Sequence, residues 1–324
     1  MLRVHFTPED LTRTVVCADP DPLWEVLLSG FRLQERRPPL GFRPWLDALA
    51  TDRSGIAATR RGIHVLRVLA PMGPYFPDFL TPAAARLGLD DGLDALCGTP
   101  QRELRGQLET LARWKRLPGW VRPLADGDVT AVTKLAFVLR EFHNAAIAPH
   151  RDVVGRPVTI DYAHRLGAFT SGGLEGLFDS MRPLLRWQPP VLEVEYSVDR
   201  ELNLDGRGLR LVPSYFCHRV PVSFADSGLP PTLVYPVDQE FRWRTTRSTR
   251  SLDALLGTTR SAVLHAIAHG ATTSQLARRL DTSVSSVSRH AAVLRGAGLV
   301  ASQRQNQAVF HSVTPLGAAM LERT

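Results

Sequence analysis

The chain has 324 residues, of which 44% are hydrophobic, so it is long enough for about two domains with cores of their own and too apolar for a disordered protein. Its cysteines, Cys17, Cys97 and Cys217, lie far apart, which excludes a disulfide framework and a zinc ribbon and favours a reducing compartment. Acidic residues precede any apolar stretch at the N-terminus, and no run of about 18 uncharged apolar residues occurs. We therefore expect a cytoplasmic protein with no membrane partner.

The positive charge is confined to the last quarter of the chain. Residues 241–324 contain 11 Arg and three acidic residues, a balance of +8, whereas residues 1–240 contain 28 Lys and Arg against 29 acids, a balance of −1. A basic segment of this kind indicates binding to a polyanion. The alternative is chance clustering, because the chain uses 37 Arg and only 2 Lys.

The first 240 residues predict a mainly helical domain with short strands at its two ends. Residues 2–6 and 12–16 are β-branched runs that predict strands. Pro22 can begin an amphipathic helix that extends to residue 35. Further helical periodicity covers residues 100–115, 128–147 and 174–187, and we expect Pro183 to kink or end the last of these helices.

The apolar pattern changes to a period of two after Pro189. Residues 191–198 alternate, and the dipeptide Asp205-Gly206 predicts a two-residue hairpin turn between flanking strands. Residues 231–237 predict a further strand. The Arg-rich segment 241–251 has no apolar periodicity, so we expect it to join two domains.

No catalytic motif is recognisable in residues 1–240. Glu141, His143 and His150 form the densest set of metal ligands, but Pro149 is expected to end their helix. Cys217 and His218 could act as nucleophile and base in name only, because adjacent strand residues point to opposite faces. The tryptophans favour core positions, although they could also line an apolar effector pocket: Trp24, Trp45, Trp114, Trp120 and Trp187.

The C-terminal segment predicts three helices in succession. Thr258 can cap the first helix, and Thr272 with Gln275 fits a capping box for a short second helix. Ser283 can cap a longer third helix whose buried stripe would be Val287, Ala291 and Leu294.

This order fits a helix-turn-helix followed by a wing. A helix that enters the major groove, which is about 12 Å wide, needs small donors and an arginine on its leading face, and the third helix has serines at 285, 286 and 288 and Arg289 there. Residues 299–304 and 308–313 alternate as two strands joined by a turn at 305–307, with Arg304 near the tip. Thr314-Pro315 can begin a closing helix. The plainer alternative is a packed three-helix unit without DNA.

The segment 255–321 resembles the winged helix of ArsR/SmtB-type bacterial regulators. The resemblance rests on LGTTR, TTSQLARRL, SVSSVSRH, LRGAGLV and the closing TPLG. It implies a homodimer that binds a partly palindromic operator in double-stranded DNA, commonly as a repressor. It also implies that Ser286, Ser288, Arg289, His290 and Arg304 contact DNA. We add the hydroxyl residues Thr273, Ser283 and Ser285 to the predicted DNA-binding residues.

The segment also departs from the family's pattern. Ala291 replaces the usual Leu, and Asn306 and Gln307 replace a Gly and a second Arg in the wing, which puts one phosphate contact in doubt. The recognition segment has no Cys and the closing helix has no His, so we expect neither a metal sensor nor any cofactor. The long front part resembles that of larger ArsR-like regulators of high-GC bacteria.

We therefore predict an α+β chain with a mainly helical N-terminal regulatory or dimerisation domain (1–240), an Arg-rich junction (241–251) and a winged helix-turn-helix (252–324). The predicted function is transcriptional regulation, most simply repression, with no enzyme activity. One alternative is a small-molecule enzyme in residues 1–240 with an appended DNA-binding domain. Another is a regulator that has no ligand, in place of one that senses an effector of unknown identity.

Overall fold

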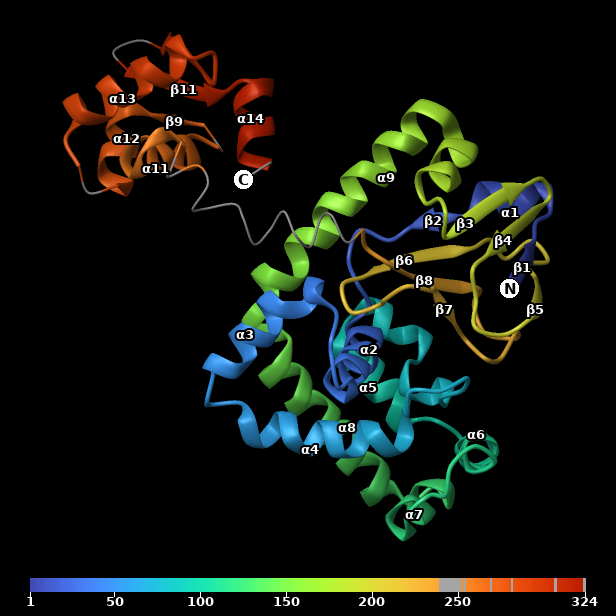
Figure 1. The fold of residues 1–324 in the computed structure, drawn as a ribbon. Coiled ribbons are helices and arrows are strands. Elements are labelled where there is room, and N and C mark those ends of the chain that lie inside the picture. The colour runs from blue at the N-terminus through green and yellow to red at the C-terminus, as the bar shows by residue number, and fades with distance from the viewer. Residues whose placement is uncertain (239–251, 253–254, 269, 281, 306–307, 323–324) are drawn as a thin grey trace. The chain divides into compact units, whose positions relative to one another are not determined.

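The computed structural model describes residues 1–238, 252, 255–268, 270–280, 282–305 and 308–322 (Figure 1). The chain divides into two units, Met1–Phe241 and Arg242–Thr324. The predicted junction, 241–251, lies outside the described residues. No helix in the described part of the chain is long and apolar enough to cross a membrane.

Helices make up most of the first unit. The helix α2 (Pro22–Gln34) begins as predicted, because Pro22 fits the first turn and the Asp21 side chain accepts hydrogen bonds from the backbone N–H of Leu23 and Trp24. Its neighbours pack around one large core with it: α3 (Arg43–Thr51), α4 (Ile56–Leu69), α5 (Leu89–Cys97), α6 (Gln101–Ala112), α7 (Arg122–Ala125) and α8 (Val129–Ala146). Short 3₁₀ turns connect them: η1 (Leu40–Phe42), η2 (Asp78–Leu80), η3 (Ala83–Leu87), η4 (Gly119–Val121) and η5 (Ala148–His150).

The long helix α9 (Arg151–Ser180) has a sharp bend. Gly172 and Gly173 depart from helical geometry, and Gly173 has a φ of 60°, a value that glycine adopts without strain. The chain reverses there, so that Gly176 lies against the backbone of Ala168. Residues 151–173 were not predicted as a helix.

Two four-stranded sheets complete the first unit. The first sheet has the order β3-β4-β1-β5, in which β1 is parallel to β5. The second has the order β2-β6-β8-β7, in which β2, β6 and β8 are parallel. The strands are β1 (Leu2–His5), β2 (Val15–Val16), β3 (Leu185–Gln188), β4 (Val191–Val194), β5 (Arg200–Asn203), β6 (Arg210–Ser214), β7 (Val222–Ser223) and β8 (Thr232–Pro236).

The second sheet separates two hydrophobic cores. Val212 and Val234 are paired and belong to the helical core, while Leu211 and Leu233, which point to the opposite face, belong to a core shared with the first sheet. In Figure 1 the strands β6 and β8 accordingly lie between α2 and the strands β1 and β4. This sheet is therefore buried on both faces.

The prediction that the strands on either side of Asp205-Gly206 pair with each other in a hairpin is wrong. Both residues have positive φ, 52° and 78°, so the local turn does form. However, β5 pairs with β1 and β6 pairs with β2 and β8, so the turn passes the chain from one sheet to the other. The helix α1 (Pro8–Arg13) holds this crossing, because Asp10 accepts from the Gly208 N–H and Arg13 donates to the Gly206 carbonyl.

Two further boundary predictions are also wrong. The expected strand 12–16 is reduced to two residues, since Thr7 and Asp10 form a capping box that starts α1 across residues 8–13. The helix expected at 174–187 ends at Ser180, before Pro183, as expected for that proline, and residues 185–187 belong instead to β3, which pairs with β4.

Several single-residue expectations were also wrong. Trp24 and Trp45 are buried, but Trp114 is 63% exposed and Trp120 is 38% exposed, so these two are not core residues. Cys217 and His218 follow β6 in a loop, so the strand geometry invoked for them does not apply.

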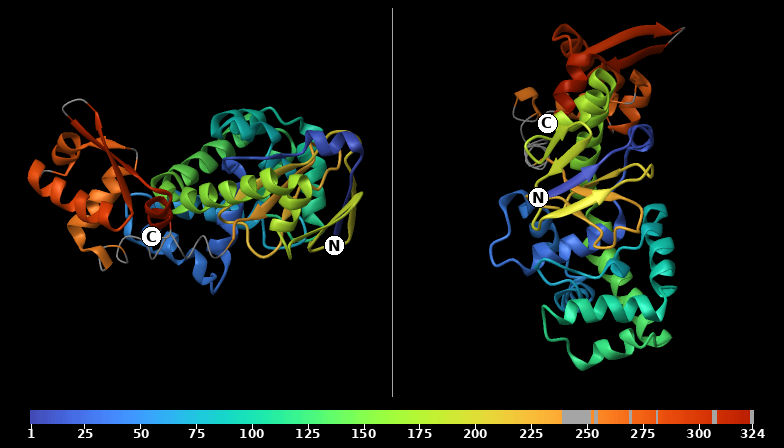
Figure 2. Two further views of the ribbon diagram at one scale, coloured as in Figure 1. Left: turned by 90° about the horizontal axis from the view of Figure 1, so that it is seen from above. Right: turned by 90° about the vertical axis from the view of Figure 1, so that its right-hand side faces the viewer.

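The second unit contains the helices α11 to α14 and a three-stranded sheet. The helices are α11 (Thr258–Ile267), α12 (Thr273–Arg279), α13 (Val284–Gly296) and α14 (Pro315–Glu322). The sheet has the order β10-β11-β9 and consists of β9 (Ala271–Thr272), β10 (Val300–Gln305) and β11 (Ala308–Val313). Figure 2 shows β10 and β11 projecting from this unit as a long hairpin. The unit is a winged helix-turn-helix.

Its local details agree with the sequence patterns except at the start. The capping box of Thr272 and Gln275 and the cap at Ser283 are both present. Gly257, and not Thr258, occupies the cap position of α11. The turn residues Asn306 and Gln307 lie outside the described residues. The short strand β9 was not predicted.

Candidate nucleic-acid interface

The helices α12 and α13 form the helix-turn-helix. Ser283 accepts a hydrogen bond from the Ser286 N–H at 3.1 Å, which fixes the start of α13. Val287, Ala291 and Leu294 are buried, as predicted, and pack α13 into the core of the unit. Because this stripe determines the rotation of the helix, it also determines which side chains face solvent.

The outward face of α13 is narrow and made of small residues around one arginine. Ser285, Arg289, Ala292 and Gly296 are all exposed, and their spacing of four, three and four places them along one line opposite the buried stripe. Three of them have side chains no larger than that of Ser. Such a face can enter a groove closely while Arg289 reaches beyond it.

The remaining residues predicted on α13 lie beside this line. Ser288 is exposed on one flank, and Ser286 and His290 are half-buried on the other. Ser283 and Ser285 form a hydrogen bond between their hydroxyls at 3.0 Å. The structure therefore brings the predicted serines, Arg289 and His290 together around the first two turns of the helix.

Thr273 has partners within the unit. Its hydroxyl lies 2.9 Å from Nε2 of His311, and the other ring nitrogen of His311 lies 2.8 Å from the Ser302 hydroxyl. His311 is 3% exposed, and its burial, with Arg295 nearby, lowers its pKa. Thr273 thus helps to hold the wing against α12. The sequence reasoning missed His311, although a histidine in an alternating strand beside two hydroxyl residues was visible.

Arg304 lies on the same face of the wing as His311, which contacts Thr273. It follows Ser302 by two residues on β10 and pairs with Val309, just as Ser302 pairs with His311. Alternation along the strands therefore places Arg304 on the His311 face, against which α12 packs. Its side chain is exposed. Arg304 and the outward face of α13 could thus contact one duplex together.

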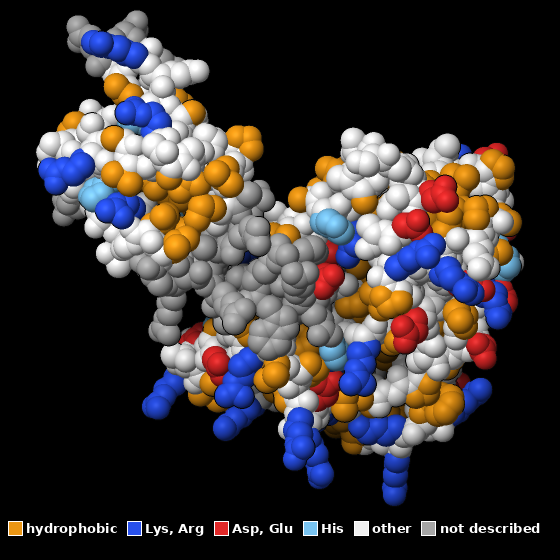
Figure 3. Space-filling model, turned by 45° about the horizontal axis from the view of Figure 1, so that its top comes forward, with side chains coloured by type: hydrophobic (Ala, Val, Ile, Leu, Met, Phe, Trp, Pro, Cys, Tyr) orange, Lys and Arg blue, Asp and Glu red, His pale blue; other side chains and the backbone are white. Residues whose placement is uncertain are grey.

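The described arginines of this unit are exposed and form no ion pair with any other residue that the structure describes. Arg260, Arg278, Arg279, Arg289, Arg295 and Arg304 are all exposed. All salt bridges among the described residues lie in the first unit. Figure 3 shows several of these arginines on one face of the second unit. Exposed guanidinium groups on a small domain with a net charge of +8 in residues 241–324 favour a polyanion.

The closing helix is fixed by the motif that the sequence suggested. Thr314 donates to the carbonyl of Gly298 at 2.6 Å and accepts from the N–H of Gly317 at 3.1 Å. A side chain at Gly317 would collide with the carbonyl oxygen of Leu299. Thr314 and Gly317 therefore join α14 to the base of the wing.

The suggested metal ligands do not share a helix. α8 ends at Ala146, and His150 belongs to a separate 3₁₀ turn that contains Pro149. No group of three metal-binding side chains occurs among the described residues.

Comparison with known proteins agrees with this geometry. The model of the family described as "Helix-turn-helix domain" matches residues 258–303, from the start of α11 into β10. No curated protein and no solved structure matches the chain. The C-terminal unit therefore contains a helix-turn-helix domain, the kind of domain by which transcription regulators bind DNA.

Proposed function

We propose that this protein is a homodimeric transcriptional repressor of the ArsR type that binds a partly palindromic operator. The observation that carries the proposal is the outward face of α13, where Arg289 stands among Ser285, Ala292 and Gly296. A helix with this face fits the major groove, and arginine pairs with the guanine edge through two hydrogen bonds. The wing arginine, Arg304, contacts the backbone or the minor groove beside it.

The proposed dimer is the arrangement by which helix-turn-helix proteins read a palindromic operator. Two copies of α13 must lie about 34 Å apart to reach successive major grooves on one face of the duplex. A signal that changes this spacing would release the operator. Size-exclusion chromatography with light scattering on the full chain tests the proposal; a monomer that binds a single half-site would contradict it.

We infer that the first unit regulates DNA binding and is not an enzyme. A pocket of this unit contains one thiol, Cys17, whose pKa is raised by burial, so it is a poor nucleophile near neutral pH. The Thr232 hydroxyl in the same pocket donates to the carbonyl of Pro230, and no histidine lines the pocket. Turnover of any small molecule in this pocket would contradict the inference.

The decisive test is loss of DNA binding in Arg289→Ala. Fluorescence anisotropy on the DNA upstream of the gene, after footprinting locates the site, measures the dissociation constant. We expect the variant to lose about 1 to 3 kcal/mol of binding free energy, because it loses a contact to a base.

Arg260→Ala is the matched control, since it removes the same charge from an exposed position on α11. It should change the affinity by much less. Equal affinity of wild type and Arg289→Ala would remove Arg289 from the interface, and equal losses in both variants would leave only a general charge effect.

A further inference from the structure

A pocket of about 510 Å³ lies in the first unit between the second sheet and the beginning of α2. Arg210, Val212 and Thr232 line it from β6 and β8. Arg210 is paired with Thr232 in the sheet, so both project from the same face, the one that meets the helical core. Residues near the start of α2 and in η3 close the other side. The volume is in the range of small-molecule sites.

Two guanidinium groups line this pocket, those of Arg210 and Arg86. Arg210 is half-buried, and its side chain donates to the sulfur of Cys17 at 3.2 Å. Arg86, from η3, is exposed at the rim. Neither forms a salt bridge with any residue that the structure describes. Because a guanidinium remains charged at all physiological pH values, these two groups form a candidate anion site.

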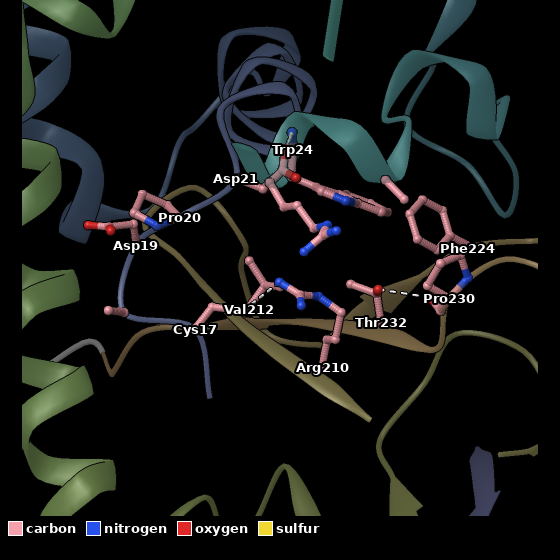
Figure 4. Close-up of a pocket in the computed structure, with 13 residues that line it drawn as sticks. Cys17, Asp19, Pro20, Asp21, Trp24, Arg210, Val212, Phe224, Pro230 and Thr232 are labelled. Carbon is pink, nitrogen blue, oxygen red and sulfur yellow. Dashed lines mark hydrogen bonds between the residues drawn. The ribbon is translucent and has the colours of Figure 1, made fainter. Parts of the chain in front are cut away.

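Two acidic residues line the same pocket, and neither forms a salt bridge with Arg210, although the charge of Arg210 opposes the rise in the pKa of Asp21 that burial causes. Figure 4 shows the carboxylate of Asp19 pointing away from Arg210. Asp21 is 7% exposed, and one of its oxygens accepts the N–H groups of Leu23 and Trp24 at 3.0 and 3.2 Å. Burial raises the pKa of Asp21 to about 6. One negative charge near two positive ones leaves room for a single further negative charge and disfavours a dianion.

The rest of the wall is apolar and aromatic. Trp24 and Phe224 both line the pocket and contact each other, with ring centroids 5.4 Å apart. Figure 4 shows their rings side by side on one wall and Arg210 reaching in from the strand below. Flat rings contact such a wall well and gain apolar burial.

We propose that this pocket binds a small organic carboxylate with a flat, apolar body. The carboxylate would bind to Arg210 and Arg86, and the body would lie against Trp24 and Phe224. This proposal rests on the proposed function, because it names the chemical class of the signal that the regulator would sense. Binding of the carboxylate can nevertheless be measured without DNA.

Isothermal titration calorimetry on the full chain tests the site directly. The probes are phenylacetate and 1-naphthoate, with their neutral carboxamides and benzylamine as comparisons. We expect the carboxylates to bind and the amides and the amine to bind at least about tenfold more weakly, since they lose the charged hydrogen bonds. Absence of carboxylate binding, or equal binding of the amides, would overturn the proposal.

Variants locate the binding site in the pocket. Arg210→Gln should weaken carboxylate binding at least about tenfold. Arg86→Gln should weaken carboxylate binding as well. Because Arg86 lies on the exposed rim, this variant can still test the site if Arg210→Gln does not fold. Arg122→Gln on α7, where the side chain is 87% exposed, is the control and should bind normally. Unchanged binding in both pocket variants would overturn the assignment.

Asp21 provides a readout that a nonspecific ligand would not affect. A bound anion favours the protonated form of Asp21, so its pKa rises on binding. Titrations in buffers of different ionisation enthalpy should show proton uptake at pH 6 and little at pH 8. Cys17, Asp19, Arg86 and Arg210 are the other titratable or charged groups that line this pocket, and the Asp21→Asn variant, which preserves the cap, should abolish the uptake. Proton release at pH 6 would contradict the proposal.

The two proposals can fail separately. A chain that binds its operator but none of the carboxylates would refute only the ligand site. A chain that binds carboxylates with the Arg210 dependence but no DNA would refute only the regulator.

Discussion

His311 places one imidazole between the wing and the helix-turn-helix, with both ring nitrogens within hydrogen-bonding distance of hydroxyl groups. A neutral imidazole satisfies this arrangement, because one nitrogen donates and the other accepts. Burial and Arg295 disfavour the charged form and lower its pKa. The residue therefore couples the attachment of the wing to pH.

We expect the wing to lose stability in mild acid. The pKa of His311 in the folded chain lies below its unfolded value of 6.5, so the unfolded state binds a proton first as the pH falls. The stabilisation is complete above pH 6.5 and declines below it. Hydrogen exchange of peptides from β10 and β11, corrected for intrinsic rates at pH 7.5 and 5.5, measures the effect.

His311→Gln should remove most of this dependence, while His265→Gln, at an exposed position on α11, should leave it unchanged. Equal protection at both pH values in the wild type would show that His311 does not titrate with local opening.

Among the elements, α9 is fixed by a buried polar network. Asp161 forms a salt bridge with Arg165 at 2.8 Å and accepts from the Tyr235 hydroxyl of β8 at 2.8 Å. Arg165 also donates to the carbonyl of Ser180, beyond the bend at Gly172. The network thus joins both arms of α9 to the second sheet.

Removing Asp161 should destabilise the first unit strongly. Asp161→Ala leaves the buried Arg165 without its counter-charge, which costs about 3 to 5 kcal/mol. Asp47→Ala is the matched control, because Asp47 and Arg43 have the same spacing on α3 but side chains 64% and 70% exposed, and such pairs contribute about 0 to 1 kcal/mol. Urea unfolding followed by tryptophan fluorescence compares them; similar midpoints would contradict a structural role for the network.

Helices whose ends depend on nearby residues could be predicted from the sequence, whereas strand pairings that depend on distant residues could not. The caps at Asp21, Thr272 and Ser283 act within three residues, so the sequence locates the starts of α2, α12 and α13. The same holds for the buried stripe of α13, which determines the candidate DNA face. By contrast, β5 pairs with β1, nearly 200 residues away, and no turn signal encodes that choice. The sequence offered Trp24 as a residue that could line an effector pocket, and it does line the pocket at Arg210, but the pocket itself could not be located because three distant segments form it.

For the whole molecule, the asymmetry of charge predicts a steep salt dependence of DNA binding. The balance of +8 in residues 241–324 against −1 in residues 1–240 confines the attraction for phosphate to the C-terminal segment. With about four or five phosphate contacts per protomer, the logarithm of the binding constant of a dimer should fall with the logarithm of salt concentration at a slope of roughly −7 to −9.

Arg304→Ala should reduce the magnitude of that slope by about 2 in a dimer, one contact per protomer, with little change in sequence preference. Anisotropy titrations between about 50 and 200 mM salt would measure this change in slope. A slope unaltered by Arg304→Ala would place the wing away from the backbone.

The pairing of β1 with β4 and β5, and of β2 with β6, has a consequence for biosynthesis. The first sixteen residues leave the ribosome before any of their partners, which lie between residues 191 and 214. Until those partners emerge, the helices from α2 to α8 can associate through local contacts, whereas β1 and β2 have no strand to pair with. Contacts of such long sequence separation form slowly and leave strand edges exposed meanwhile. Translation that stalls before β8 would therefore release a chain with a helical core and unpaired strands, the form most prone to aggregate and to engage chaperones.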